Sequence, residues 1–420
     1  VVINKSTSDL LDTLNSELDK ITHCLDRSLS LSLFIDGKFA TFSTNRLEEN
    51  EIRDFVNTCM DITKMLEPDP CRTLPDTTRC TCKAINGKEL GLYDSEYDSL
   101  NAGKRKELAL SHCLQKNDVP QGVKLITEEG QYSDSEFDSI TMDSNGLFCR
   151  HRETSFEYAS EVTIENSHGE KASAYWWTSS PFLKDFNCEG IGQEALKRAL
   201  AQIGAKSTKS GEKIMVVSSD VASKLVTPLQ NALGGYAIQQ NNSFLMNSLG
   251  KKVFSDKLTL IDEPHIKGES GSRLFDSEGI ATKNMNIIRD GIVQTYFINT
   301  YISNKTGMEA TIEDATRPHL LPFPREGMDK EAILKACGEG IFVTGFNGGN
   351  CNSATGDFSY GVEGFEFKDG IIGRPVSEMV ITGNFITLWN NLLYAGNDTR
   401  RCMSKLVPTL AFKDVSFSGE

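Results

Sequence analysis

Short apolar runs that alternate with polar residues recur along the chain, and many of them flank an Asn-Gly or Asp-Gly pair. Both central residues of a two-residue hairpin turn need positive φ, which these residue types adopt most readily. The pattern therefore predicts β-hairpins, with turns at Asp36-Gly37, Asn86-Gly87, Asn145-Gly146, Asp290-Gly291 and Asp369-Gly370. Another pair of strands is predicted on either side of His168-Gly169.

Helical periodicity is confined to a few segments. Residues 47–66 place their apolar side chains on one stripe, and Pro68 follows as a stop signal. Further helices are predicted over residues 102–115, 192–204 and 329–337. Because strands and helices do not alternate regularly, we expect an α+β fold rather than a doubly wound sheet.

One segment near the start of the chain is ambiguous. Its large apolar residues recur at helical spacing, namely Leu11, Leu14, Leu18, Ile21 and Leu25. Taken alone, this spacing predicts a helix.

A length of 420 residues suggests two domains. After the third predicted helix, a polar stretch gives way abruptly to an apolar run, and we place the domain boundary there. Residues 1–210 are expected to form a mixed α/β domain with a β-meander and helices. Residues 211–420 are expected to form a mainly antiparallel, strongly curved β-sheet or barrel-like domain.

Charge and cysteine content narrow the function classes. The formal net charge of -14 disfavours binding to nucleic acid, and no run of eighteen apolar residues predicts a membrane span. The eleven cysteines are odd in number and scattered, which favours reduced thiols in a cytoplasmic protein. Thiolate ligation of a metal is an alternative for Cys71, Cys80 and Cys82, but their spacing matches no common zinc motif and their role stays open.

The six histidines argue against a zinc protease site in this chain. Such a site on a helix needs two imidazoles on one face with a glutamate between them, as in HExxH or HExxxH. No two histidines here lie within one helical turn. We therefore predict no bound metal, no cofactor and no catalytic residue in this chain.

A glycine-rich stretch spans residues 345–364, with Asp357 inside it. It could cradle a phosphate, but it lacks the G-K-[ST] ending of a P-loop and no helix is predicted to follow. The structural alternative is that the glycines relieve crowding at bulges and bends of a curved sheet. In that case Asp357 is expected to accept hydrogen bonds from backbone N–H groups of a turn.

Several ordered motifs resemble the TldD/PmbA family over nearly the whole chain. They are F-L-x-x-S-L-G-K at 244–251, D-S-E-G at 276–279, T-G-D-F-S-x-G at 355–361, P-V-S-E-x-x-I-x-G-N at 375–384 and G-N-D at 396–398. Members of this family were first described as modulators of DNA gyrase and are understood as a two-subunit metalloprotease.

The resemblance assigns the chain to one of two branches. The TldD branch carries HExxxH shortly before the S-L-G-K block, whereas residues 222–235 here contain neither histidine nor glutamate. Cys402 lies near the position of the other branch's cysteine ligand, but one thiolate cannot hold a catalytic zinc. The chain thus resembles the PmbA branch, also called TldE. The family fold further implies strands from Leu10 to Leu33 and a helix ahead of Val1.

The function that this resemblance implies is that of a non-catalytic subunit. It would pair with a zinc-bearing, TldD-like catalytic subunit, or form a homodimer, and act in the cytoplasm on small or unfolded peptides. The alternative is a stand-alone interaction protein that modulates DNA gyrase or a toxin–antitoxin system. Residues expected to line a peptide cavity or to form structural motifs are Asp276, Glu278, Gly279, Asn347, Thr355, Gly356, Asp357, Ser359 and Glu378.

An extended peptide is most readily held by adding a strand to an open sheet edge. The predicted hairpin at 286–297 and the strand after Asp357 are the candidates for that edge. We therefore expect the region beyond residue 210 to make the subunit contact.

Overall fold

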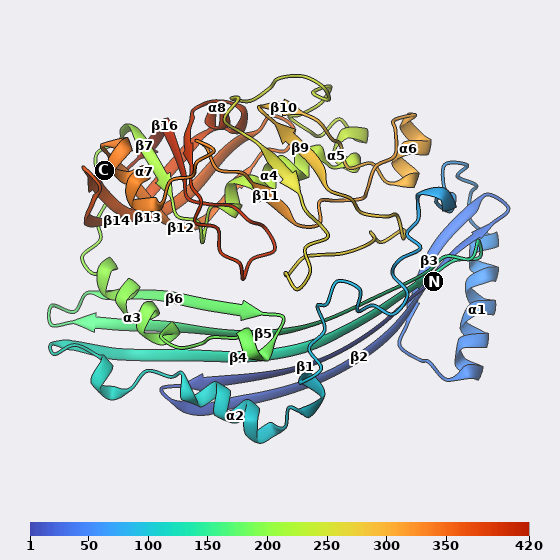
Figure 1. Ribbon diagram of the computed structural model, residues 1–420, viewed down its shortest axis with the longest axis horizontal. Coiled ribbons are helices and arrows are strands. Elements are labelled where there is room, and N and C mark those ends of the chain that lie inside the picture. The colour runs from blue at the N-terminus through green and yellow to red at the C-terminus, as the bar shows by residue number, and fades with distance from the viewer. Residues whose placement is uncertain (420) are drawn as a thin grey trace.

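The computed structural model describes residues 1–419, with Lys116 described for its backbone alone. A six-stranded antiparallel sheet occupies the first part of the chain, in the order β3-β2-β1-β4-β5-β6. Its strands are β1 (Val2–Leu14), β2 (Glu17–Ile35), β3 (Lys38–Thr44), β4 (Val123–Met142), β5 (Phe148–Asn166) and β6 (Lys171–Ser180). Figure 1 shows that the long strands of this sheet curl into a half-barrel.

Three helices accompany the sheet. They are α1 (Glu49–Lys64), α2 (Ala102–Ser111) and α3 (Ile191–Gln202). Helices α2 and α3 cover the face that buries Tyr132, Tyr158 and Val162, and α3 also contacts β14 of the second part. Short 3-10 turns are η1 (Thr77–Arg79), η2 (Tyr97–Ser99), η3 (Lys116–Asp118) and η4 (Leu183–Asp185).

The second part of the chain closes a barrel. Strands β14-β13-β12-β7-β16 are neighbours in this order, and β14 pairs with the end of β16, so five strands form a ring. Strand β15 pairs with the beginning of β16. All pairs are antiparallel except β12 with β7. The strands are β7 (Gly211–Val217), β12 (Glu339–Cys351), β13 (Asp357–Lys368), β14 (Ile371–Asn384), β15 (Leu392–Ala395) and β16 (Leu410–Ser418).

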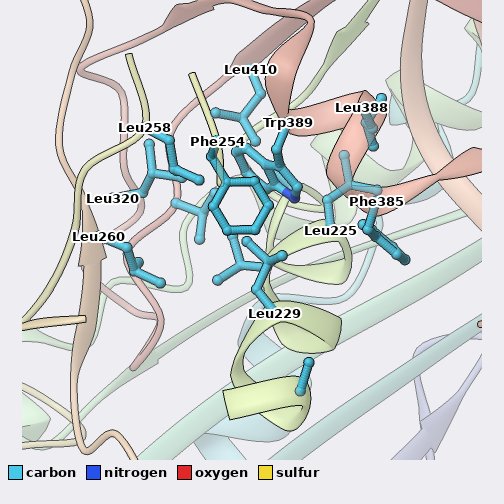
Figure 2. Close-up of a cluster of buried hydrophobic side chains, with 14 of the residues drawn as sticks. Leu225, Leu229, Phe254, Leu258, Leu260, Leu320, Phe385, Leu388, Trp389 and Leu410 are labelled. Atoms are coloured by element: carbon cyan, nitrogen blue, oxygen red, sulfur yellow. The ribbon is translucent and has the colours of Figure 1, made fainter. Parts of the chain in front are cut away.

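A smaller sheet and five helices pack beside the barrel. The sheet has the order β10-β9-β8-β11, with β8 (Leu260–Asp262), β9 (Met285–Arg289), β10 (Ile292–Val293) and β11 (Pro318–Leu320). The helices are α4 (Ser223–Leu233), α5 (Gly235–Gln239), α6 (Thr300–Thr306), α7 (Lys330–Cys337) and α8 (Phe385–Asn390). Helices α4 and α8 meet in one large apolar core, where Leu225 and Leu229 lie beside Phe254 and Trp389 (Figure 2).

The predicted α+β class, with a β-meander followed by a curved barrel-like region, is confirmed. The helices predicted over 47–66, 102–115, 192–204 and 329–337 correspond to α1, α2, α3 and α7. Five of the six predicted hairpin turns join consecutive strands. The prediction at Asn86-Gly87 was wrong, because Gly87 forms an isolated bridge to His151 rather than a hairpin.

The helix predicted from the leucine spacing of residues 11–25 was also wrong. These residues form β1 and β2, as the family resemblance implies. Asn15 and Ser16 adopt φ values of 50° and 67° and make the tight turn between the two strands. The apolar side chains therefore lie on two strands, where Leu11 is buried and Leu25 is exposed.

The division near residue 210 stays a prediction. All strands of the first sheet end by Ser180 and those of the other sheets begin at Gly211, but Cys80 forms an isolated bridge with Ile280 across this division. Within residues 1–419, no helix combines the length and the apolar character needed to cross a membrane.

Candidate functional site

A cleft of about 490 Å³ lies between the first sheet and the barrel. Strand β6 and helix α3 form one wall, and β12 and β13 form the other. Its aromatic and charged lining residues are Glu161, Tyr175, Trp176, Trp177, Glu194, Lys197, Arg198, Asp220, Phe342, Glu363 and Phe365. The mixture of apolar walls with a few polar groups is typical of a ligand-binding cleft.

Two arginines fix the tryptophan wall of this cleft. The guanidinium carbon of Arg198 lies 3.7 Å from the ring centroid of Trp176, and that of Arg400 lies 4.0 Å from it. Arg198 also donates to Asp220, with 2.8 Å between Nη1 and Oδ2, while Arg400 donates to the carbonyl oxygen of Trp177. Cation–π contacts and a charged hydrogen bond thus connect β6 and α3 to the second part of the chain.

Glu363 and Asn347 supply polar groups on the opposite wall. The Asn347 side-chain amide donates to Glu363 Oε2 at 3.0 Å. A side chain at Gly345 would collide with the Glu363 carboxylate, so glycine at that position allows the carboxylate to lie over β12. Among the residues lining the cleft there is neither histidine nor cysteine.

Thr355 and Gly356 lie in the turn between β12 and β13, and Asp357 begins β13. Asp357 Oδ2 accepts from the Thr355 hydroxyl at 2.7 Å, and Oδ1 accepts from Asn384 Nδ2 at 2.9 Å. These bonds, led by that from Asn384, lower the pKa of the Asp357 carboxyl. Gly356 has φ 80°, and a Cβ there would lie 3.0 Å from the ring of Phe244.

The predicted role of Asp357 as an acceptor for backbone N–H groups was wrong. Asp357 pairs with Asn384 as the first residue of β13, so its carboxylate meets the side chain of the neighbouring strand. Asn352 accepts the turn's backbone bonds instead, from the N–H groups of Ala354 and Thr355 at 3.0 and 3.2 Å.

The bulges predicted for the glycine-rich stretch are present in β12. Strand β12 is bulged at two places along its pairing with β13. A side chain at Gly349 would collide with the carbonyl oxygen of Ser359, and one at Gly364 with that of Phe342. Ser359 itself is a ladder residue that pairs with Thr382.

The edge predicted for peptide addition at the strand after Asp357 was wrong. That strand, β13, is paired with β12 on one side and β14 on the other, so it has no open edge. Strand β10, in the hairpin at 286–297, lies at the end of its sheet, but its outer side is bonded to residues 250–252.

Asp276, Glu278 and Gly279 form a structural turn. Asp276 accepts from the backbone N–H groups of Glu278, Ile280 and Glu313, each at 3.0 Å. Burial nevertheless raises the pKa of Asp276 to about 6, although these bonds act in the opposite direction.

The same turn holds two other elements in place. Glu278 Oε2 accepts from the backbone and the hydroxyl of Thr300 at 2.9 and 2.7 Å, where α6 begins. Gly279 has φ 81° and lies against Leu147 of the β4–β5 turn, which leaves no room for a side chain.

Glu378 is exposed and adopts φ 54° at an irregularity of β14. The predicted residues thus occupy separate places, and Asn347 is the one among them that lines the cleft. Trp176, Arg198 and Arg400 were missed. The adjacent pair Trp176-Trp177, in a chain with three tryptophans, was the available signal.

The residues at the family's metal position do not fit a zinc site. Segment 222–235 contains α4, whose Leu225, Val226 and Leu229 are fully buried in the large core. Within the described residues, no group of three or more His, Cys, Asp or Glu side chains could hold a metal ion. The backbone carbonyl of Cys402 accepts from Ser179 at 2.9 Å, and all eleven cysteines, Cys71, Cys80 and Cys82 included, are free thiols.

Comparison with known proteins agrees with this architecture. The chain is 28% identical over 422 residues to the metalloprotease PmbA of Escherichia coli O157:H7, which covers 98% of this chain and 91% of that protein. A crystal structure from Bacteroides thetaiotaomicron, of a proposed modulator of DNA gyrase, superposes with a TM-score of 0.93 at 39% identity. It covers 100% of this chain and 94% of its own.

The crystal structure of TldE from Thermococcus kodakarensis shares the fold, with a TM-score of 0.84 at 16% identity over 100% of this chain and 96% of its own. Two family models also match. The PmbA/TldA metallopeptidase central domain matches residues 103–203, and the C-terminal domain matches residues 210–419. The chain therefore belongs to the PmbA/TldD metallopeptidase family.

Proposed function

We propose that this chain is the non-catalytic subunit of a two-subunit peptidase, and that a TldD-like partner carries the zinc. The pair would act in the cytoplasm on small or unfolded peptides. The observation that carries the proposal is the packing of α4, the helix at the position where the catalytic branch has its metal ligands.

Helix α4 is built as a core element. Leu225 and Leu229 contact the cluster around Phe254 and Trp389 (Figure 2), and both are completely buried. A histidine at either position would bury a polar ring without a partner, at a cost of about 1–3 kcal/mol. The packing of α4 therefore favours apolar side chains at these positions.

The cleft beside Trp176 gives the subunit a role in binding. Its aromatic side chains offer apolar contact area, while Asn347 and Glu363 offer an amide and a carboxylate. In the proposed pair, a peptide lying here would be held by these groups, and the partner would cleave it. Together with a partner subunit, the cleft would form one wall of a peptide cavity.

Co-purification tests the proposed pairing. An affinity-tagged version of this chain, expressed at native level in its own host, should retain a chain that carries HExxxH. Light scattering of the purified pair should then give the mass of a complex of the two chains. Recovery of DNA gyrase without such a chain would contradict the proposal and favour the alternative of a stand-alone modulator.

The expected contact surface is also open to test. We propose that residues beyond 210 make the contact with the partner, over an obligate-type interface of roughly 2,000 Å² or more. Hydrogen exchange of the pair against the single chains should show protection in that region. Protection confined to the first sheet would contradict this part of the proposal.

A further inference from the structure

The outer edge of the first sheet is open along the first half of β2. Strand β1 pairs with β2 from Glu17 to Ser30, but on the other side β3 pairs with Leu29–Ile35 alone. Within residues 1–419, no other backbone group bonds to residues 17–28. In Figure 1 this part of β2 forms the rim of the half-barrel. Unpaired N–H and C=O groups on such an edge are a template for another strand.

Large apolar side chains are left uncovered on this edge. Ile21 is 59% exposed and Leu25 is 53% exposed. They pair with Leu11 and Thr7 of β1, and Leu11 is buried beneath α2. Helix α2 therefore covers the neighbouring strand and ends short of Ile21 and Leu25. A strand that added here would bury both side chains.

The sequence of the edge is complementary to itself. When two copies are placed antiparallel about His23, Lys20 lies opposite Asp26, Ile21 opposite Leu25, and Thr22 opposite Cys24, each pair occurring twice. Directly opposed apolar and opposite-charge pairs stabilise antiparallel sheets. Neither Lys20 nor Asp26 has an ion-pair partner within the described chain.

We propose that the open edge of β2 binds a second copy of this chain, antiparallel, about a two-fold axis through His23. The two half-barrel sheets would then continue as one sheet across the axis. Each copy supplies the apolar pair and the charges that the other lacks.

The register is set from both ends of the open edge. A bulge places Asp12 opposite Lys20 but Thr13 opposite Leu18, so the regular ladder begins at Lys20, and β3 occupies the edge from Leu29 onward. If the axis passed through Thr22 or Cys24 instead, Lys20 would no longer lie opposite Asp26, and Ile21 would no longer lie opposite Leu25. The self-pairing is therefore specific to one register.

This contact is independent of the proposed catalytic partner. It uses residues 20–26, whereas the proposed contact with a TldD-like chain uses residues beyond 210. A variant that breaks the β2 contact should leave binding to that partner unchanged, so the two proposals fail separately.

Charge complementation tests the inference directly. Sedimentation velocity should show wild-type dimers that dissociate on dilution. Asp26→Lys alone and Lys20→Asp alone should each be monomeric, because each places like charges opposite one another twice. An equimolar mixture of the two variants should dimerise again, since one chain then presents two carboxylates and the other two ammonium groups.

Lys283→Asp serves as the control, because it changes charge in an exposed loop ahead of β9, in the second part of the chain, and should dimerise like the wild type. A wild type that stays monomeric, or single variants that dimerise as the wild type does, would overturn the inference. Circular dichroism of each variant verifies that the chain is folded.

Cross-linking tests the register separately. In a Cys24→Ser background, His23→Cys should form a disulfide-linked dimer with diamide as the oxidant, because residues opposed in an antiparallel pair have Cα atoms about 4.5–5.5 Å apart. Ser28→Cys in the same background should cross-link no more than its parent. Cross-linking through Ser28→Cys rather than His23→Cys would overturn the proposed axis.

Discussion

Arg198 on α3 donates to Asp220 just after β7, with 2.8 Å between the two side chains, and thereby connects the first sheet to the barrel. Both groups are largely shielded, with 29% and 9% of their side chains exposed. The same guanidinium lies over Trp176. Arg198 therefore contributes both to the wall of the cleft and to the contact between the two parts of the chain.

Arg198→Gln should lower the free energy of unfolding by about 1–3 kcal/mol, because it leaves the shielded Asp220 carboxylate without its charged donor. Urea unfolding measures this loss. Arg53→Gln is the matched control, since Arg53 pairs with Glu49 on the exposed surface of α1 and should cost less than about 0.5 kcal/mol. Equal losses in the two variants would contradict the account of this contact.

Gly356→Ala should be destabilising for two reasons: the residue has φ 80°, and the added Cβ would lie 3.0 Å from Phe244. We expect a loss of about 1–3 kcal/mol in urea unfolding. Gly307→Ala separates the two causes, because Gly307 has φ 73° with open space around its Cβ position. If Gly356→Ala costs no more than Gly307→Ala, the contact with Phe244 contributes nothing.

Asp276 should make stability fall as pH rises. Its folded-state pKa of about 6 lies above the ordinary value of 3.8, so the folded chain holds this proton more tightly than the unfolded chain does. The contribution is fully present below pH 3.8 and is lost as pH rises through about 6. The unfolding free energy of the wild type minus that of Asp276→Asn should therefore decrease as pH rises across this window.

For Asp357→Asn, the dependence of stability on pH should have the opposite sign to that for Asp276→Asn. The pKa of Asp357 is lowered in the folded chain by the bonds from Asn384 and Thr355. Its contribution is present above the ordinary value of 3.8 and is lost as pH falls through the lower folded value. The same pH trend for both variants would show that one of the two environments is misassigned.

The purified chain should hold no stoichiometric zinc, because α4 offers apolar side chains where the catalytic branch has ligands. Elemental analysis after dialysis without chelator measures this. About one zinc per chain, retained through dialysis and released only by a strong chelator, would contradict it.

Local sequence signals predicted much of the fold and missed elements that depend on tertiary contacts. The Asp-Gly and Asn-Gly turns identified most hairpins, but Asn15-Ser16 adopts the same kind of turn without a glycine, so the leucine spacing around it was misread. Helix α4 escaped prediction; it contains Pro228 and is stabilised by burial of its leucines in the core.

The cleft was harder to predict than the motifs. Asn347 was identified because it belongs to a recognisable glycine-rich block, whereas Asp276 and Asp357, identified in the same way, lie outside the cleft. Trp176, Arg198 and Arg400 are distant in sequence and meet only through the packing of β6, α3 and the loop after β15. No spacing rule joins such residues before the fold is known.

Peptide hydrolysis by the separated and recombined subunits tests the central claim most directly. This chain, an HExxxH-bearing partner and their mixture would each be assayed with an unstructured fluorogenic peptide. The account predicts cleavage by the mixture that is lost when the glutamate of the partner's motif is replaced by glutamine, and no cleavage by this chain alone. Chelator-sensitive cleavage by this chain alone, at the rate of the mixture, would contradict it.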